Sequence, residues 1–447
     1  MKSTSAPPTA LREHMRRALV IATLCAIPAA ATAQQPAHRD TVFLDELQRA
    51  AVASDPRSAQ SEFFTAQSAR RLATLRNERL PSLSIVGAAN YLSDVAGIGA
   101  ILPGAMIPGV SHDQYDTHLA LRAPLFDPTR SRRAAIESAQ DAESQARLRA
   151  TLWQQRLAVT DAFFGVLLRD SQLRSLDAVI DDIDARMVVA QKRVAAGAAL
   201  RSEALLLLAE RERRRQSREE ILIDRDAARD VVVSLTGRPL GTSAVLATRS
   251  EVYRSISARI DADTLRARPE FEQFATTQAL IDARRQSIAA LELPRVSAVA
   301  RTGYGRPGLN PLGRAFDSYW IAGVQVEWAP WTWGRTQRDQ EVQSLQSRVV
   351  ASEEAAFRSV LHRTTITDRA RISALERGVQ TDDSVLVLRD RILAESRLRF
   401  DAGEMTAPEY IARLTEQLTA ALDRDTRRLR LDEARARYLT TLGLEIR

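Results

Sequence analysis

The side chains that could carry chemistry are few and scattered along the 447-residue chain. Beyond residue 33, the histidines are His38, His112, His118 and His362, without the spacing of a metal site. Asp181, Asp182 and Asp184 form a cluster, but three carboxylates on one predicted helix are typical of a solvated face. The histidines and the cluster therefore indicate neither metal binding nor acid–base chemistry.

Glycine-rich and nucleophile motifs do not change this conclusion. The stretch "GYGRPG", residues 303–308, is followed by no predicted helix, so it indicates a hairpin loop rather than a phosphate cradle. The sequence has no phosphate-binding loop and no hydrolase nucleophile elbow. We therefore expect a protein that is not an enzyme and that has no cofactor or metal.

The charge pattern argues against nucleic-acid binding. Lys+Arg 63 against Asp+Glu 56 gives a formal net charge of +7. Much of this excess lies in the first 33 residues, and later arginines alternate with acids, as in "ERERRRQSREE", residues 210–220. Such interleaving is typical of solvated helix faces, so no nucleic-acid partner is predicted.

Residues 1–33 have the pattern of a secretory signal peptide. A basic region precedes an apolar run over residues 18–30 and a small-residue cleavage site at residues 31–33. The only cysteine, Cys25, falls inside the apolar run, so the expected mature chain has no cysteine. No later segment reaches about 18 consecutive apolar residues, the length of a membrane-spanning helix.

The remaining chain contains an internal duplication. Residues 55–91 align with residues 268–304 at an offset of 213, and later landmarks align at an offset of 206. The aligned pairs include Pro56 and Pro269, Pro81 and Pro294, Tyr91 and Tyr304, Pro124 and Pro330, Gly197 and Gly403, Glu203 and Glu409, and Gly237 and Gly443. A period of this length indicates two copies of one large unit rather than a solenoid.

Each copy is predicted to contain two strands and a long helical hairpin. The first repeat, 34–245, has strands at about 82–93 and 114–126 and a hairpin at about 128–236. The second repeat, 246–447, has strands at about 295–305 and 318–331 and a hairpin at about 335–443. A coiled-coil seam is predicted from Leu173, Leu176, Ile180, Ile183, Met187, Ala190 and Val194.

The four strands alternate apolar and polar residues, which indicates a sheet with one wet face. Trp320 and Trp328 share one face and lie about 26 Å apart at ~3.3 Å per residue. This separation approaches the height of an outer-membrane barrel between its aromatic girdles. We predict a membrane girdle of Tyr91, Tyr115, Tyr304, Trp320, Trp328 and Trp331; a soluble sheet packed on the helices is the alternative.

Four strands cannot close a barrel, because small closed barrels have about eight. Since open edges in lipid leave backbone groups unpaired, several copies must share one barrel. Two, three or four copies would supply about 8, 12 or 16 strands. Strand–helix junctions are predicted at Pro81, Pro124, Pro294 and Pro330.

Because these features occur in this order, the sequence resembles the TolC-like outer-membrane efflux channels. The resemblance rests on the duplication, the "LPSLS" and "LPRVS" openings, the "AP" and "WTWG" strand exits, and the paired "RVAAG" and "RFDAG" turns. It implies a mixed α/β membrane protein: a homotrimer with a 12-stranded β-barrel in outer-membrane lipid and an α-helical tunnel through the periplasm. It also implies hairpin tips that contact a periplasmic adaptor, a membrane-fusion protein joined to an inner-membrane transporter.

The resemblance assigns roles to residues at the two tips. The adaptor-docking residues would be Arg193, Gly197, Leu200 and Glu203 in the first tip, and Arg399, Gly403 and Thr406 in the second. Glu409, with Glu203, would narrow a periplasmic aperture, although Ala412 stands where the family often has a second acid. Alternatively, both glutamates are helix-start acids favoured by the macrodipole, and both glycines serve the backbone alone.

These features predict a passive exit duct of a tripartite efflux or secretion system, located in the outer membrane and extending into the periplasm. The alternative is a periplasmic coiled-coil adaptor or scaffold without a barrel of its own.

Overall fold

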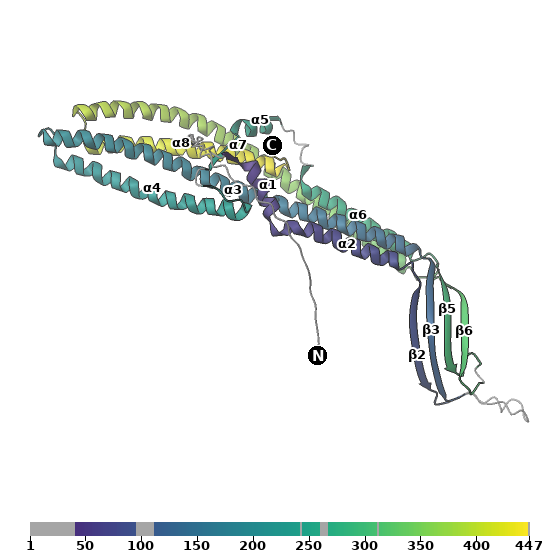
Figure 1. Ribbon diagram of the computed structural model, residues 1–447. Coiled ribbons are helices and arrows are strands. Elements are labelled where there is room, and N and C mark those ends of the chain that lie inside the picture. The colour runs from purple at the N-terminus through teal and green to yellow at the C-terminus, as the bar shows by residue number, and fades with distance from the viewer. Residues whose placement is uncertain (1–40, 95–110, 242–243, 260–266, 311–312, 446–447) are drawn as a thin grey trace, which may run out of the picture. The chain divides into compact units, whose positions relative to one another are not determined.

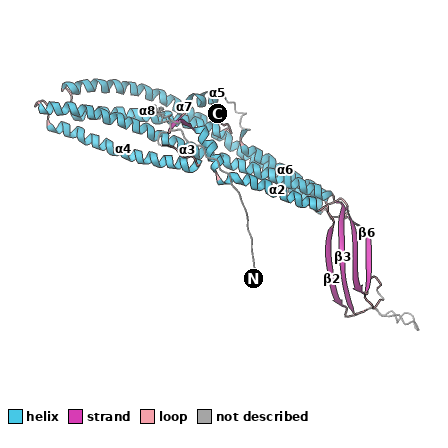
Figure 2. Ribbon diagram, in the orientation of Figure 1, coloured by secondary structure: helices cyan, strands magenta, loops and turns pink. Residues whose placement is uncertain are grey.

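The computed structural model describes residues 41–94, 111–241, 244–259, 267–310 and 313–445. The predicted signal peptide, residues 1–33, lies outside these ranges. In chain order the elements are β1 Thr41–Phe43, α1 Leu44–Ser54, a 3-10 turn Pro56–Ala59, α2 Gln60–Asn77, β2 Ser82–Tyr91, β3 Asp113–Phe126, α3 Pro128–Ala195, α4 Arg201–Thr236, β4 Val245–Ala247, α5 Ser250–Arg259, α6 Pro269–Ala290, β5 Arg295–Arg306, β6 Asp317–Glu327, α7 Arg335–Ala402 and α8 Ala407–Thr441. Figures 1 and 2 show these helices and strands.

The two repeats have closely matched helices. Both α3 and α7 have 68 residues, which corresponds to about 100 Å at ~1.5 Å per residue, while α4 has 36 and α8 has 35. Left-handed glycines follow the ends of both long helices, at Gly197 (φ 72°) and Gly403 (φ 84°). Because a β-carbon disfavours this conformation, glycine allows the chain to reverse there.

The four hairpin helices contact one another in the order α4–α3–α8–α7, which leaves α4 and α7 at the two margins (Figure 1). One apolar cluster joins them, and it includes Leu176, Ile183, Leu207, Phe400 and Tyr410. Burial of apolar surface stabilises a fold by about 25 cal/mol per Å², so the apolar contacts in this cluster stabilise the packing of the hairpins. Of the predicted seam, Met187 and Val194 are only partly buried and line a groove at the tip.

The long strands form one antiparallel sheet in the order β2-β3-β5-β6, so β2 and β6 are its edges (Figure 1). Strand β6 ends at Glu327, short of the predicted end near residue 331. The indole Nε1 of Trp328 instead donates to the carbonyl of Glu292 at 3.0 Å, and Pro330 follows without an N–H to continue the ladder.

The prediction that Pro124 marks a strand–helix junction is wrong. Pro124 lies inside β3, where it faces Ser297, and the register shifts between Pro124 and Phe126. A bulge at this point accommodates a residue that has no backbone donor. The junction is Asp127, whose side chain accepts from the N–H of Thr129 at 3.0 Å and so caps α3. Pro81 and Pro294 do directly precede β2 and β5, and Pro330 lies between β6 and α7.

A second core lies beside the middle of α3. The parallel pair β1–β4 and helices α1 and α5 pack there around buried side chains that include Leu44, Leu47, Phe163 and Tyr253. Burial raises the pKa of the Tyr253 hydroxyl to about 12. This part was not predicted, since three-residue strands are too short to show a period.

The duplicated glycines Gly237 and Gly443 give the first prediction. Both have positive φ, and a β-carbon on Gly443 would lie 2.5 Å from the backbone carbon of Ala267. On Gly237 it would lie 2.9 Å from the Cβ of Ser54, a side chain that can shift. We expect Gly443→Ala to destabilise the fold by about 2–3 kcal/mol and Gly237→Ala by about 1 kcal/mol.

Thermal unfolding in detergent measures both effects. Gly241→Ala is the matched control, because a β-carbon there would meet nothing within 4 Å. Equal melting temperatures for the Gly443→Ala and Gly241→Ala variants would contradict the strain argument.

Candidate functional site

The four-stranded sheet has an apolar face. The register places Ile85 opposite Leu119, Leu119 opposite Thr302, and Thr302 opposite Trp320, so these side chains lie on the same side of the sheet. The same face carries Leu83, Ala89, Leu121, Ala123, Val296, Ala298, Ala300, Ala322, Val324 and Val326. Ile85 is 80% exposed and Trp320 74% exposed in the single chain. A row of exposed apolar side chains this long indicates a missing apolar environment.

Aromatic side chains gather at both ends of this face. At one end Phe316 stacks on Tyr304 at 5.5 Å and contacts Tyr115 at 6.0 Å, while Tyr91 stacks on His112 at 5.9 Å. At the other end Trp328, Trp331 and Trp333 are exposed. The structure thus places the six predicted girdle residues at or near the two ends of the strands, and it adds Phe316 and Trp333, which sequence reasoning had missed.

The opposite face of the sheet is polar. It carries Asp116, His118 and Arg122 on β3 and Arg301 on β5, with Tyr319 and Gln325 on β6. Asp116 accepts from the Tyr319 hydroxyl at 2.5 Å and lies 2.6 Å from Nδ1 of His118. This alternation gives the sheet one face suited to hydrocarbon and one suited to water.

Among the described helices, none combines the length and apolar character needed to cross a bilayer. In the same part of the chain, no group of three or more His, Cys, Asp or Glu side chains could hold a metal ion.

At the hairpin tips, Arg193 joins the two repeats. From α3 its guanidinium donates to the carbonyl of Phe400 at 3.1 Å and lies 5.8 Å from the Phe400 ring centroid. It also packs on the left-handed Gly403, where an added β-carbon would lie 2.9 Å from the arginine. Arg193 of the first predicted tip therefore contacts the second tip at the end of α7 and at Gly403.

Asp182 lies within this inter-hairpin contact, so its interpretation as part of a solvated face is wrong. The Tyr410 hydroxyl donates to Asp182, and Nε of Arg397 lies 3.0 Å from it. The Asp182 side chain is only 11% exposed. Burial, and then the bond to Asp182, raise the pKa of Tyr410 well above its usual value, so the hydroxyl remains a donor.

A groove opens between α3 and α4 beside the first tip. It has a volume of about 510 Å³ and is lined by Met187, Gln191, Val194, Ala195, Arg201, Ala204, Leu205, Leu208 and Arg211. Leu205 is 54% exposed and the nearby tip residue Leu200 is 71% exposed. The lining of this groove combines apolar side chains, such as Leu205 and Leu208, with the basic side chains of Arg201 and Arg211.

The two tip glutamates differ in their surroundings. Glu409 closes a capping box: it accepts from the backbone N–H of Thr406 at 3.0 Å and from its hydroxyl at 2.9 Å. These bonds lower the pKa of Glu409, which is exposed and therefore stays ionised. Glu203 occupies the same position in α4, but Leu200 provides no side-chain cap, and a buried Oε2 of Glu203 has no hydrogen-bond partner.

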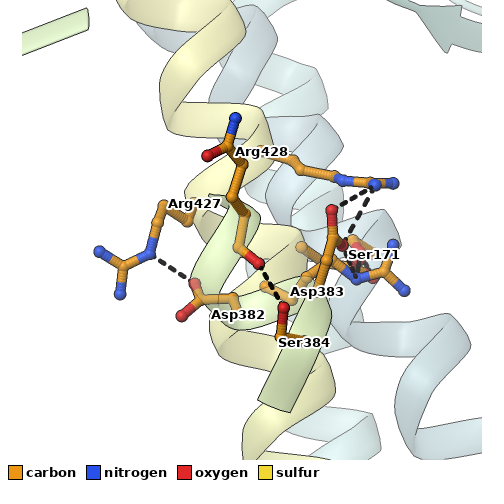
Figure 3. A network of polar contacts seen from close by, with 9 residues as sticks. Ser171, Asp382, Asp383, Ser384, Arg427 and Arg428 are labelled. Carbon is orange, nitrogen blue, oxygen red and sulfur yellow. Dashed lines mark hydrogen bonds and ion pairs between the residues drawn. The ribbon is translucent and has the colours of Figure 1, made fainter. Parts of the chain in front are cut away.

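Farther from the tips, ion pairs fasten α7 to α8 (Figure 3). Arg427 donates to Asp382 at 2.5 Å, and Arg428 donates to Asp383 at 3.0 Å. Ser171 on α3 donates to Asp425 at 2.9 Å, which ties the first repeat into the same network. Arg427 also lies against Gly378, where a β-carbon would clash with it at 2.6 Å.

Comparison with known structures identifies the fold. No protein-family model matches the chain, and no curated protein matches it by sequence. Solved structures do match. CusC, studied for transmembrane channel formation, is similar with a TM-score of 0.66 and 14% sequence identity, and the match covers 90% of this chain and 92% of CusC. VceC, an outer membrane protein of Vibrio cholerae, matches with a TM-score of 0.62 and 12% identity, over 90% of this chain and 97% of VceC. The MtrE outer membrane channel of Neisseria gonorrhoeae matches with a TM-score of 0.62 and 15% identity, over 90% of this chain and 89% of MtrE.

At these identities the comparison establishes the fold, which is that of the TolC-like outer-membrane channels, as the sequence predicts. The matches extend over 90% of this chain and over 89–97% of each of these structures.

The Asp182 contact gives the second prediction. Asp182→Asn removes the counter-charge of Arg397 and weakens the bond from Tyr410, and we expect a loss of about 1–3 kcal/mol. The tips should open locally, so trypsin should cut more rapidly at the neighbouring arginines. Asp181→Asn, the same change one residue away on an exposed side chain, is the control. Equal cleavage rates for the two variants would disprove the role of Asp182.

Proposed function

We propose that the protein is a passive exit duct of a tripartite efflux or secretion system. Three copies form a homotrimer, whose sheets make one 12-stranded barrel in the outer membrane and whose helices make a tunnel through the periplasm. An inner-membrane transporter supplies the energy, and a periplasmic adaptor connects it to the duct. The likeness of fold to outer-membrane channels supports this proposal.

The observation that carries the proposal is the four-stranded sheet itself. One face is apolar between two aromatic ends, and the outer edges of β2 and β6 have no partner strand within the sheet. In hydrocarbon each unpaired backbone group costs several kcal/mol. All neighbouring strands are antiparallel, so β6 of one copy can pair with β2 of the next in the same pattern.

The helical margins support assembly in the same way. Exposed apolar residues on α7 recur at Val342, Leu345 and Val349, and again at Val385, Leu388 and Ile392. These steps of three and four place each set on one helix face. On the other margin, α4 exposes Leu206, Ile223 and Val231. Contact between α4 of one copy and α7 of the next would cover both.

The tips are the proposed site of adaptor docking. Gly197, Leu200 and the groove beside Leu205 give an exposed apolar surface with basic residues at its rim, and Arg399, Gly403 and Thr406 form the equivalent turn of the second repeat. Glu203 and Glu409 start the returning helices, where their carboxylates can narrow a periplasmic aperture.

The alternative, an adaptor without a barrel, explains the paired hairpins but not the sheet. A soluble sheet would cover its apolar face with helices, whereas Trp320, Val324 and Val326 are exposed along the whole of β6. The membrane assignment therefore accounts for more of the structure.

Cysteine crosslinking tests the shared barrel, because the only natural cysteine, Cys25, lies in the predicted signal peptide. We expect Val86→Cys on β2, combined in turn with Ile321→Cys, Gly323→Cys or Gln325→Cys on β6, to give disulfide-linked trimers on non-reducing gels. All four positions are on the polar face of the sheet, and β2 and β6 are its two edges.

Ala120→Cys with Ile321→Cys is the control, since β3 is an interior strand and its neighbours are already β2 and β5. Monomers in every edge combination would reject the shared barrel.

The aperture is tested with Glu409→Gln. Glutamine can keep the capping box with Thr406 while it removes the charge, so the start of α8 should remain folded. If the carboxylate faces the aperture, potassium permeability relative to chloride should fall in bilayer recordings. A Thr406→Ala variant, which loses the cap but keeps the charge, should leave this ratio unchanged. Identical selectivity in the Glu409→Gln protein and the wild type would remove Glu409 from the aperture.

A further inference from the structure

The polar face of the sheet contains two arginines that the function proposed above does not use. Arg122 on β3 and Arg301 on β5 are both exposed, and neither lies within ion-pair distance of a carboxylate among the described residues. By contrast, Arg295 at one end of the same face pairs with Glu327 at 2.8 Å. At the other end Asp116 is engaged by His118 and Tyr319. Positive charge is thus concentrated in the middle of this face.

The two arginines occupy neighbouring positions on the sheet, and each side chain has a partner on β6. In the register Arg122 lies opposite Val299 and Arg301 opposite Ala120, so the arginines are diagonal neighbours at about 7 Å. Arg122 donates to Oε1 of Gln325 at 3.2 Å, and Arg301 lies 5.8 Å from the Tyr319 ring centroid. Each guanidinium has five N–H donors, so most remain available to a ligand.

Both arginines line one hollow on this face. It has a volume of about 520 Å³, and its other polar side chains are Ser82, Ser84 and Gln325. These neutral groups can donate hydrogen bonds, and no carboxylate lines this hollow, although Arg301 also borders an adjoining hollow that contains Asp116. Arginine pairs with phosphate and carboxylate groups through two parallel N–H bonds, which suits such a hollow to anions.

We propose that Arg122 and Arg301 form an anion-binding belt on the inner wall of the barrel and favour cargo that carries phosphate, carboxylate or sulfonate groups. This inference rests on the proposed duct, in which three copies place six arginines around one lumen. Twelve strands about 4.8 Å apart and tilted by about 40° give a wall radius of roughly 12 Å. Since the side chains extend inward and the Debye length is about 10 Å at 0.1 M salt, their fields overlap at the axis.

The first experiment measures binding of inorganic tripolyphosphate to the detergent-solubilised full chain by calorimetry, at low and at high salt. We expect salt-sensitive binding that weakens by about tenfold or more in R122Q/R301Q. The charge-preserving R122K/R301K should retain most of the affinity. Ile321→Glu, which places a carboxylate opposite Arg301 and leaves both arginines in place, should weaken binding as R122Q/R301Q does.

A second experiment records the chloride-to-potassium permeability ratio in planar bilayers. The ratio should fall on the order of threefold in R122Q/R301Q and in the Ile321→Glu variant, but not in R122K/R301K. Wild-type tripolyphosphate affinity in both charge-altering variants would overturn the belt, as would the absence of binding to the wild type. The duct would survive either result, since it is tested separately by crosslinking of the paired-cysteine variants and by channel formation of the wild type.

Discussion

The structure depends on the backbone hydrogen-bonding groups at the two edges of its four-stranded sheet. The apolar face suits this sheet to hydrocarbon, yet hydrocarbon offers no partner to the N–H and C=O groups on the outer sides of β2 and β6. Only other strands can satisfy them, and the same sequence supplies strands of the right direction on each neighbouring copy. In the proposed ring of copies every edge would be paired, and the exposed margins of α4 and α7 would be covered in the same step.

The internal duplication is compatible with the same proposed ring. Each repeat contributes two strands and one long hairpin, so a ring of copies is nearly uniform although each copy is one chain. The left-handed glycines Gly237 and Gly443 occupy equivalent ends of α4 and α8, and the equal lengths of α3 and α7 keep the tips at one level. Between the repeats, Arg193 and Asp182 fix the hairpins to one another with hydrogen bonds and charge instead of a continuous chain.

Much of this was readable from the sequence because it repeats with a clear period. The strands alternate with period two, the hairpins have no proline over their long helices, and the repeat offsets locate both turns. Features set by tertiary contact were not readable. Pro124 looked like a junction because a bulge has no sequence signature of its own. Asp182 looked solvated because its partners, Tyr410 and Arg397, lie more than two hundred residues away. Its one signal was its position on the buried side of α3, next to Ile183.

The two tips differ in how their returning helices, α4 and α8, begin. The second tip satisfies its own helix start, because Thr406 and Glu409 cap α8 reciprocally. The first tip does not, because Leu200 has no capping side chain and Glu203 keeps a buried oxygen without a partner. The apolar groove beside Leu205 lies at the first tip, so in the proposed duct it adds to the docking surface of that tip, while the capping box fixes the start of the helix that carries Glu409 at the second.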